Sequence, residues 1–505
     1  MPKGMENLLP LMAENPFRCC EMNEMIVVFS FICISILLIA VSGRNARLRN
    51  SILVATALLT VVSVVSLLPG VLRGDVLRVD IAPLLPGAHL CLRVDAMGLL
   101  FALVASFLWL ITIFYAIGYM NALEEHAQTR FFIYFTLSIF CALGVAFSAN
   151  FLTLYLFYEL LSLCTYPLVV HDQTPEAYAA GKKYLVYLLG TSIFFLCPAI
   201  ILTYFSAGTL DFADSIQKGV FHGGVQPAIV ITCYVLCVLG FAKAAIMPFH
   251  GWLPSAMVAP TPVSALLHAV AVVKVGVFSL SRVMLYIFGL DILQRFHLNI
   301  YTGIFVSCTI LLASLIALTK DNLKARLAYS TVSQLSYIIL GVSLLTPDGV
   351  CGGLLHIANH AVSKITLFFC AGIIFVASRK KNISEMTGLG REMPLTFFIF
   401  ALAALSMIGA PPTAGFITKW YLMLGTMTAG EYVFFIVLAV SSLLNIGYFM
   451  PIVFRALFVS PDGANSSLVR KVPLTMLLPI VVTSILILTL GMYPDFLLRL
   501  VKLVR

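Results

Sequence analysis

The sequence predicts an all-α polytopic membrane protein with about 14 transmembrane helices. Of its 505 residues, 61% are hydrophobic and only 10% are charged, and the mean hydropathy is +1.03. Soluble domains carry about 25% charged residues, so much of this chain must face lipid. Apolar runs of about 20 residues recur along the chain, and each can cross the hydrocarbon core as a helix. These unbroken runs lack the alternation of a membrane β-barrel.

The predicted spans form one integral domain. Residues 1–24 are a polar N-terminal tail, residues 25–497 form the membrane domain, and residues 498–505 are a short basic tail. No small-residue cleavage site follows the first apolar run, so we expect a retained anchor. We expect spans at residues 25–43, 51–70, 97–121, 131–149, 151–170, 184–206, 226–247, 258–285, 300–319, 326–346, 351–378, 394–428, 431–458 and 473–497.

Basic residues between the spans predict the orientation. Arg44, Arg47 and Arg49 follow the first span, which places that loop in the cytoplasm and the N-terminus outside. Alternation places residues 71–95, whose pattern resembles a short hairpin, on the opposite side. We therefore expect a multi-pass protein of the cell (inner) membrane. The net charge of +9 needs no nucleic-acid partner, because cytoplasmic loops are commonly basic.

Two stretches interrupt the helical pattern inside apolar spans. One, A-A-I-M-P-F-H-G-W-L-P, contains Pro248 and Pro254, and the other, G-A-P-P-T-A-G-F, contains Pro411 and Pro412. Gly/Pro interruptions in both halves of a transporter are typical of discontinuous helices that line a cavity. An ordinary proline kink is the alternative for each stretch.

Ionisable side chains also lie inside the apolar runs. A charge at the centre of a membrane helix costs about 2.5 to 3.5 kcal/mol on insertion scales, so several of them indicate a function. The candidates are Glu159, Lys243, His268, Lys274, His356, His360, Lys364 and Lys419. Apart from the histidines, all four basic candidates are lysines, although the chain has 17 arginines and 14 lysines. Arginine keeps its proton, whereas a desolvated lysine can release it, so this choice predicts proton transfer.

The spacing of these residues predicts how they cooperate. His356, His360 and Lys364 recur every four residues and share one helix face, about 6 Å apart along the axis, which suits proton hopping through water. Histidine exchanges protons near neutral pH. A lone buried histidine is more often a packing residue, and this alternative stays open for His268, which faces away from Lys274 in a regular helix.

Glu159 is the acid that we place at the centre of a span. We expect it to pair with Lys243 on a neighbouring helix, because an opposite charge nearby stabilises both charged forms while burial opposes them. A static buried ion pair is the alternative.

The cysteines do not indicate a redox centre. All twelve are scattered and none forms a C-x-x-C pair, whereas iron–sulfur sites need grouped cysteines. We therefore expect no cofactor and no metal. Whether the chain is a subunit of an enzyme stays open.

Several segments carry a specific resemblance. They are P-F-H-G-W-L-P-S-A-M-V-A-P-T-P-V-S-A-L-L-H-A, A-Y-S-T-V-S-Q-L-S-Y-I-I-L-G and H-A-V-S-K, within a similarity that runs from V-D-A-M-G-L-L-F-A-L-V to G-A-P-P-T-A-G-F-I-T-K. The chain resembles the proton-translocating antiporter-type membrane subunits shared by NADH:quinone oxidoreductase, Mrp-type cation/proton antiporters and membrane-bound hydrogenases. Because the chain ends soon after the last span, without a long lateral helix, we expect one of the shorter types, with the D-type Mrp component slightly preferred.

The resemblance implies two inverted repeats of five helices, at approximately residues 131–285 and 300–458, each with a broken helix. It also implies a series of proton stations: Glu159 with Lys243, Lys274 with His268, the central relay of His356, His360 and Lys364, and Lys419 at the exit. The implied partners are other membrane subunits, protons and the lipid bilayer, with sodium left open.

Proteins of other classes are the alternatives. A stand-alone secondary transporter of an organic solute would need polar groups shaped for its substrate, whereas the buried groups here are almost all titratable. A membrane enzyme would need clusters at the membrane surface, where the loops offer scattered candidates such as His171 and Asp172. A structural scaffold would not retain so many costly lysines.

Overall fold

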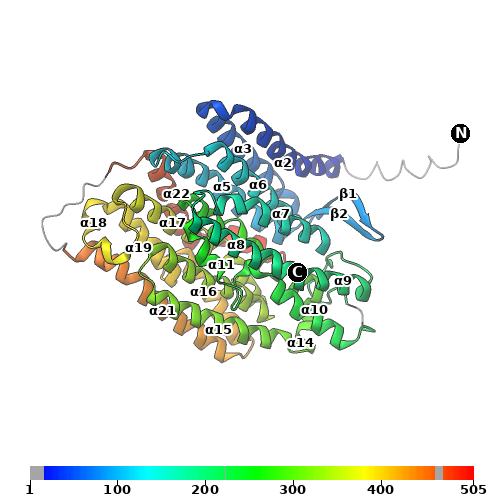
Figure 1. Ribbon diagram of the computed structural model, residues 1–505. Helices are drawn as coiled ribbons and strands as arrows, with labels where there is room; N and C mark the ends of the chain where they lie inside the picture. Colours follow the sequence, from blue (N-terminus) through cyan, green and yellow to red (C-terminus); the bar gives the residue numbers. More distant parts are fainter. Residues whose placement is uncertain (1–15, 222, 461–469, 505) are drawn as a thin grey trace.

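Helices dominate the computed structural model, which describes residues 16–221, 223–460 and 470–504. They pack side by side in one bundle (Figure 1). Each expected span coincides with one helix or with consecutive helices, which confirms the all-α membrane fold. Among the described residues, ten helices are long and apolar enough to cross a membrane, and shorter apolar helices cover Met25–Val41, Pro227–Gly240 and Pro394–Ile408. Most of the expected N-terminal tail lies outside the described residues.

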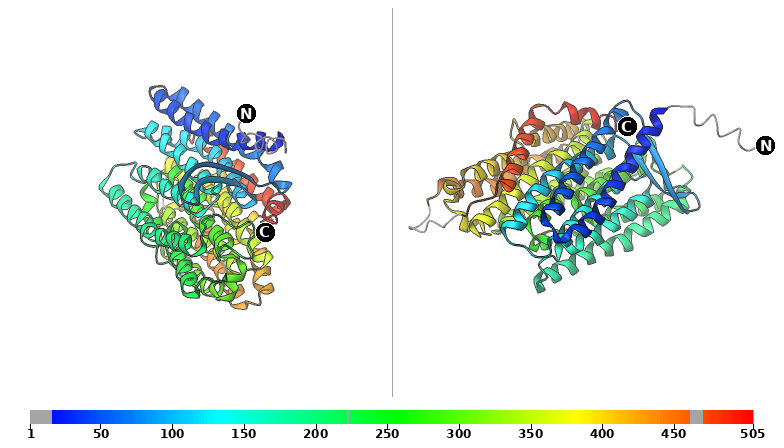
Figure 2. Two further views of the ribbon diagram at one scale, coloured as in Figure 1. Left: turned by 90° about the vertical axis from the view of Figure 1, so that its right-hand side faces the viewer. Right: turned by 90° about the horizontal axis from the view of Figure 1, so that it is seen from above.

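The first half of the chain forms the helices on one side of the bundle. They are α2 Pro16–Val41, α3 Ala46–Ser66, α4 Leu68–Leu72, α5 Ala96–Ala122, α6 Gln128–Ala146, α7 Phe151–Val169, α8 Pro175–Thr191, α9 Cys197–Ala207, α10 Pro227–Gly240, α11 Trp252–Ser255, α12 Thr261–Ala269, α13 Val272–Val283 and α14 Gly289–Arg295. Short helical segments connect some of them: η1 Ser42–Arg44, η2 Ser192–Leu196, η3 Ala242–Ala244, η4 Ala256–Val258 and η5 Met284–Phe288. The views in Figure 2 show α2 and α3 along one edge, where they pack on each other and on α5 and α6.

The second half completes the bundle. Its helices are α15 Leu298–Thr319, α16 Leu323–Ser343, α17 Pro347–Ser378, α18 Leu389–Glu392, α19 Pro394–Ile408, α20 Ala414–Thr428, α21 Tyr432–Phe458, α22 Leu474–Met492 and α23 Asp495–Val501, with η6 Ile383–Met386 before α18. Helix α23 includes part of the expected basic tail and packs against α5 and α17. The helix bounds do not relate one half of the chain to the other, so the two inverted repeats of five helices stay a prediction.

Helix α17 lies at the centre, where it packs against α5, α12, α16, α19, α20 and α22. The Thr346 hydroxyl accepts a hydrogen bond from the Gly349 N–H at its N-terminus, a favourable cap, and Pro347 occupies the first turn. Glycines allow neighbouring helices to approach closely: a Cβ added at Gly352 would lie 2.8 Å from the backbone nitrogen of Leu422 on α20. Almost every residue of α17 is buried, including the polar side chains of one face, so protein surrounds this helix on all sides.

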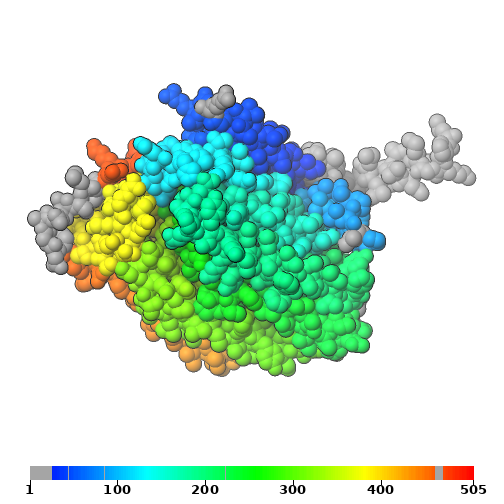
Figure 3. Space-filling model, in the orientation of Figure 1, coloured from blue at the N-terminus to red at the C-terminus, as the bar shows by residue number. Residues whose placement is uncertain are grey.

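The expected β-hairpin is present between α4 and α5. Strand β1 (Leu77–Leu85) pairs antiparallel with β2 (Ala88–Val94), with Leu77 opposite Val94. Arg78 Nη1 forms an ion pair with Asp211 Oδ2 at 3.0 Å, so the hairpin lies beside the segment that follows α9. At the opposite end, the α5–α6 connection lies beside residues that follow α17 (Figure 3). The hairpin and the α5–α6 connection, which the alternation of successive spans assigns to opposite sides of the membrane, therefore lie at opposite ends of the bundle.

Both Gly/Pro stretches interrupt a span. Helix α19 ends at Ile408, Gly409 adopts a left-handed φ of +93°, and α20 begins at Ala414, so the expected span 394–428 is two helices. Helix α10 ends at Gly240, and only the short η3, α11 and η4 follow before α12.

The structure contains a third break that the sequence analysis missed. Helix α12 ends at Ala269 and α13 begins at Val272, which divides the expected span 258–285. The segment H-A-V-A-V-V-K contains neither glycine nor proline, so it carries no local signal for a break.

Candidate functional site

Glu159 and Lys243 face each other, as the sequence predicts. Lys243 lies in η3, directly after the end of α10, and its Nζ is 4.0 Å from Glu159 Oε1 on α7. The amine donates instead to the Tyr158 carbonyl oxygen at 2.6 Å and lies 3.2 Å from the centre of the Tyr158 ring. A charge-assisted hydrogen bond would be about 2.7–2.9 Å long, so the carboxylate acts on the lysine as a nearby charge rather than as a bonded partner.

Lys274 forms a hydrogen bond with a histidine of the central helix α17. Its Nζ lies 2.8 Å from Nδ1 of His360, and both side chains are buried between α13 and α17. Among the described residues, no carboxylate lies within 4.0 Å of the amine. An amine and an imidazole at this distance can exchange one proton directly, because each can serve as donor or acceptor.

His356 continues the line of polar groups along α17. Its ring centroid is 5.6 Å from that of His360, one turn away, as the four-residue spacing predicts. Nε2 lies 3.0 Å from Oε1 of Gln334 on α16, and Nδ1 lies 3.1 Å from Oγ1 of Thr418 on α20. Thr418 directly precedes Lys419, so this hydrogen bond connects α17 to the helix that carries the last lysine.

The remaining two lysines bond to hydroxyl and carbonyl groups. Lys364 Nζ donates to Ser330 Oγ and, at 3.3 Å, to the Leu327 carbonyl oxygen, both on α16. Lys419 Nζ donates to the Ile408 carbonyl oxygen at 2.7 Å and to Ser442 Oγ at 2.9 Å. Neither amine has a carboxylate within 4.0 Å in the described part of the chain.

Two glycines allow the lysines to reach these positions. A Cβ at Gly276 on α13 would lie 2.2 Å from the backbone of Lys243, so α13 touches η3 backbone to backbone only because this position has no side chain. A Cβ at Gly409 would lie 2.6 Å from Cδ of Lys419, and the φ of +93° also favours glycine there. Both glycines therefore position lysines of the candidate site.

His268 is buried but does not join the line of hydrogen bonds. Its ring packs on Phe368 with centroids 4.7 Å apart, and neither ring nitrogen has a hydrogen-bond partner among the described residues. The break between α12 and α13 separates it from Lys274. The structure thus brings together Lys274, His360 and His356 and leaves His268 beside them.

The sequence analysis missed a buried arginine. Arg282 on α13 is fully buried, so the buried basic side chains of the bundle are not all lysines. Its Nη1 and Nη2 donate to the two carboxylate oxygens of Asp95 at 2.9 and 2.6 Å. Arg282 falls near the end of an expected span, and Asp95 precedes one, so neither looked deep in the sequence.

The polar side chains that form hydrogen bonds with these titratable groups also went unrecognised in the sequence. They are Ser330, Gln334, Thr418 and Ser442. Ser330 and Gln334 lie within A-Y-S-T-V-S-Q-L-S-Y-I-I-L-G, a segment already singled out, where several polar residues fall inside an apolar helix. That polarity was the available signal.

These buried, bonded amines and imidazoles within a bundle of interrupted helices define an antiporter-like membrane subunit. The chain belongs to the NADH:quinone oxidoreductase/Mrp antiporter transmembrane family, whose profile matches residues 148–445. This membership favours a subunit of a membrane complex over a stand-alone solute transporter.

Individual relatives come from both branches of the family. NADH-quinone oxidoreductase subunit N of Desulforudis audaxviator is 32% identical over 461 residues, covering 88% of this chain and 91% of that protein. The putative antiporter subunit mnhA2 of Staphylococcus haemolyticus is 33% identical over 374 residues, which is 70% of this chain but only 45% of that longer protein. The preference for the D-type Mrp component stays a prediction.

Solved structures share the fold. The Mrp complex from Dietzia sp. DQ12-45-1b matches with a TM-score of 0.82 and 22% identity over 94% of this chain and 96% of that chain. An archaeal membrane-bound sulfane sulfur reductase matches with a TM-score of 0.84 and 24% identity over 95% and 96%.

Proposed function

We propose that this chain translocates protons across the cell membrane as one subunit of a larger membrane complex. The observation that carries the proposal is the 2.8 Å contact between Lys274 Nζ and His360 Nδ1, buried in the bundle with no carboxylate within 4.0 Å among the described residues. A buried cation without a counter-charge is costly, which makes the amine easier to deprotonate. His360 can take that proton, and the positive charge then moves along the path with it.

The proposed path runs through the two halves of the chain. Glu159 and Lys243 form the first station, and the contact of η3 with α13 at Gly276 brings Lys243 close to the helix that carries Lys274. From Lys274 the proton passes to His360 and His356, and through the Thr418 hydroxyl toward α20. Two further stations follow: Lys364, on the central helix α17, and then Lys419 at the exit.

The side of the membrane on which each loop lies follows from the orientation that we propose, with the N-terminus outside and the basic loops in the cytoplasm. The α5–α6, α7–α8 and α15–α16 connections then open to the cytoplasm, and the hairpin lies on the outer face. Lining residues of these three connections share one cavity of about 650 Å³, which supports placing them on the same side.

Exchange of protons for sodium is a second candidate, favoured by the name of the Staphylococcus relative, a putative antiporter subunit. The two candidates differ in a measurable way. An antiporter transports protons only when sodium moves in the opposite direction, whereas a redox-driven subunit transports protons without added sodium.

Proton uptake by proteoliposomes of the whole complex tests the proposal. Lys243→Ala and Glu159→Ala should each abolish uptake while the complex keeps its full set of subunits. Lys182→Ala, which removes an exposed lysine of α8, is the matched control and should transport normally. Wild-type uptake in both Lys243→Ala and Glu159→Ala would refute the proposed path. Measuring uptake with and without sodium distinguishes the two candidates.

A further inference from the structure

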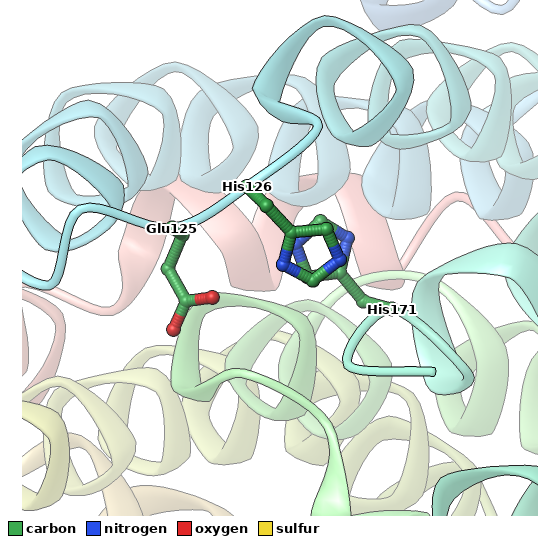
Figure 4. A group of neighbouring side chains, drawn as sticks. All are labelled: Glu125, His126 and His171. Atoms are coloured by element: carbon green, nitrogen blue, oxygen red, sulfur yellow. The ribbon is translucent and has the colours of Figure 1, made fainter. Parts of the chain in front are cut away.

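A group of metal-ligand side chains lies outside the proposed proton path, where two connections between helices meet. Glu125 and His126 belong to the connection between α5 and α6, and His171 belongs to the connection between α7 and α8. One oxygen or nitrogen atom from each of the three lies within 4.8 Å of the others. Figure 4 shows the two imidazole rings face to face, with the Glu125 carboxylate beside them.

His171 has the properties of a ligand whose partner is missing from the protein. Its side chain is fully buried, and neither ring nitrogen makes a well-formed hydrogen bond among the described residues, although a backbone group of His126 lies near enough to oppose the lowering of the ring's pKa. Burying an imidazole without partners is costly. The ring of His268 also lacks partners, but His171 differs because a second imidazole and a carboxylate lie within 4.8 Å and could share an ion with it. Arg130 Nη2 donates to the His171 carbonyl oxygen at 3.2 Å, which fixes the backbone that carries this ring.

The surroundings favour the neutral ring, which is the form that binds metals. Burial, followed by the neighbouring His126 and Arg130, lowers the pKa of His171 to about 4. The neutral ring is the form whose unprotonated nitrogen can donate an electron pair to a metal.

Carboxylates supply the negative charge that a cation needs. Glu125 and Asp172 are close enough to repel each other: after burial, the charge of Asp172 is the largest cause that raises the pKa of Glu125. Four nearby cations oppose metal binding: Arg130, Arg379, Lys324 and Lys381. A divalent ion would relieve the repulsion between the two carboxylates.

We propose that Glu125, His126 and His171 bind one divalent transition-metal ion of the zinc class. Two imidazoles and a carboxylate are a ligand set that zinc accepts, with a fourth position left for water. Calcium and magnesium prefer oxygen ligands, which disfavours them here.

Metal binding requires a small rearrangement. The rings of His126 and His171 are stacked with centroids 4.8 Å apart and planes 24° from parallel, so their nitrogens do not yet converge. Ligand atoms around tetrahedral zinc are about 3.3 Å apart. His126 is exposed, so its ring can turn out of the stack toward a shared ion while the buried His171 stays fixed. The bound ion would then connect the two loops beside the cavity that Glu125 and Asp172 line.

Metal binding by the purified full-length chain tests this site. After removal of metal with a chelator, Co²⁺ is added and its visible ligand-field absorption is recorded, and Zn²⁺ is then titrated in competition. We expect one ion per chain and the intense absorption of a four-coordinate nitrogen- and oxygen-ligated cobalt. His126→Gln, Glu125→Gln and His171→Gln should each weaken Zn²⁺ binding by at least about 10-fold, since even outer-shell changes do so.

A matched control separates this site from general surface binding. His297→Gln removes another exposed histidine, near the start of α15, and should leave binding unchanged. His126 and Glu125 are not part of the packed core, so their variants are informative even where His171→Gln fails to fold. The proposal is overturned by a wild-type chain that binds no ion, by His126→Gln binding as tightly as the wild type, or by equal losses in His297→Gln.

Discussion

Lys274 and Arg282 lie on the same helix, α13, and both are fully buried, but their surroundings differ. Arg282 donates two hydrogen bonds to the two oxygens of Asp95. Arg93 lies 3.5 Å from the same carboxylate and also pairs with Asp214, so the two arginines share two carboxylates. Lys274 bonds to a single nitrogen of His360, a partner that can take its proton. One helix thus carries a charge-paired arginine near its end and, as we propose, an amine that exchanges its proton at its start.

The difference separates structural from functional charges inside a membrane protein. A buried ion pair is stable only while both partners remain charged, so an arginine that never releases its proton suits it. A proton path needs the opposite, namely groups whose neighbours tolerate both protonation states. In this chain the hydroxyl, carbonyl and imidazole partners of Lys274, Lys364 and Lys419 meet that requirement.

The largest effect on proton uptake should come from replacing one of the proposed proton-exchanging lysines with arginine. Lys364→Arg should reduce proton uptake on the order of 100-fold, the usual contribution of a positioned proton donor, because the guanidinium keeps its proton. Uptake by proteoliposomes of the complex measures the effect. Lys182→Arg, an exposed lysine of α8, should have no effect. Normal uptake with Lys364→Arg would show that this amine never loses its proton.

Removing the counter-charge of the fixed pair should chiefly affect stability. Asp95→Asn leaves Arg282 buried without a carboxylate partner and should cost about 3–5 kcal/mol of unfolding free energy. Thermal unfolding of the purified chain measures the loss. Adding Arg282→Met to Asp95→Asn should recover much of it, since the uncompensated charge is then gone. If Asp95→Asn is as stable as the wild type, the pair is not structural.

A smaller effect is expected when the fixed cation keeps its charge but changes its shape. Arg282→Lys cannot donate to both oxygens of Asp95 from one planar group, and we expect a loss of about 1–3 kcal/mol. Proton uptake per folded complex should remain at the wild-type level. A loss of uptake comparable to that of Lys364→Arg would place Arg282 in the proton path and end the distinction.

The smallest effect concerns a hydroxyl that connects α17 to α20. Thr418→Val removes the partner of His356 Nδ1 while keeping the side-chain shape, which costs about 0.5–1.5 kcal/mol. Uptake should slow by about 10-fold at most. Thr428→Val changes an exposed threonine of the same helix and serves as the control. An unchanged rate for Thr418→Val would mean that the path bypasses this hydroxyl.

Much of the fold could be predicted because lipid makes the local signals strong. Each apolar run long enough to span the core became a helix or helix pair, and the alternation in residues 71–95 became the hairpin. Boundaries set by tertiary contacts were harder. The break between Ala269 and Val272 has no glycine or proline to announce it, so the sequence predicted one continuous span there.

The sequence identifies the titratable residues of the candidate site, but it does not identify all of their hydrogen-bond partners. The four-residue spacing placed His356 and His360 on one face, and the charge argument paired Glu159 with Lys243. The partner of Lys274 proved to be His360 rather than His268. That choice depends on the tertiary arrangement that brings the Lys274 side chain of α13 to the His360 side chain of α17, which no local sequence pattern contains.

The hydrogen bond from Lys419 to the Ile408 carbonyl oxygen connects the charge of one side chain to the end of α19. The last carbonyl groups of a helix carry partial negative charge, and a cation beside them stabilises the terminus by about 0.3–1 kcal/mol. If Lys419 exchanges its proton as we propose, this stabilisation is lost on release and the connection through Gly409 should gain conformational freedom. Binding of a single proton would then change the order of the backbone.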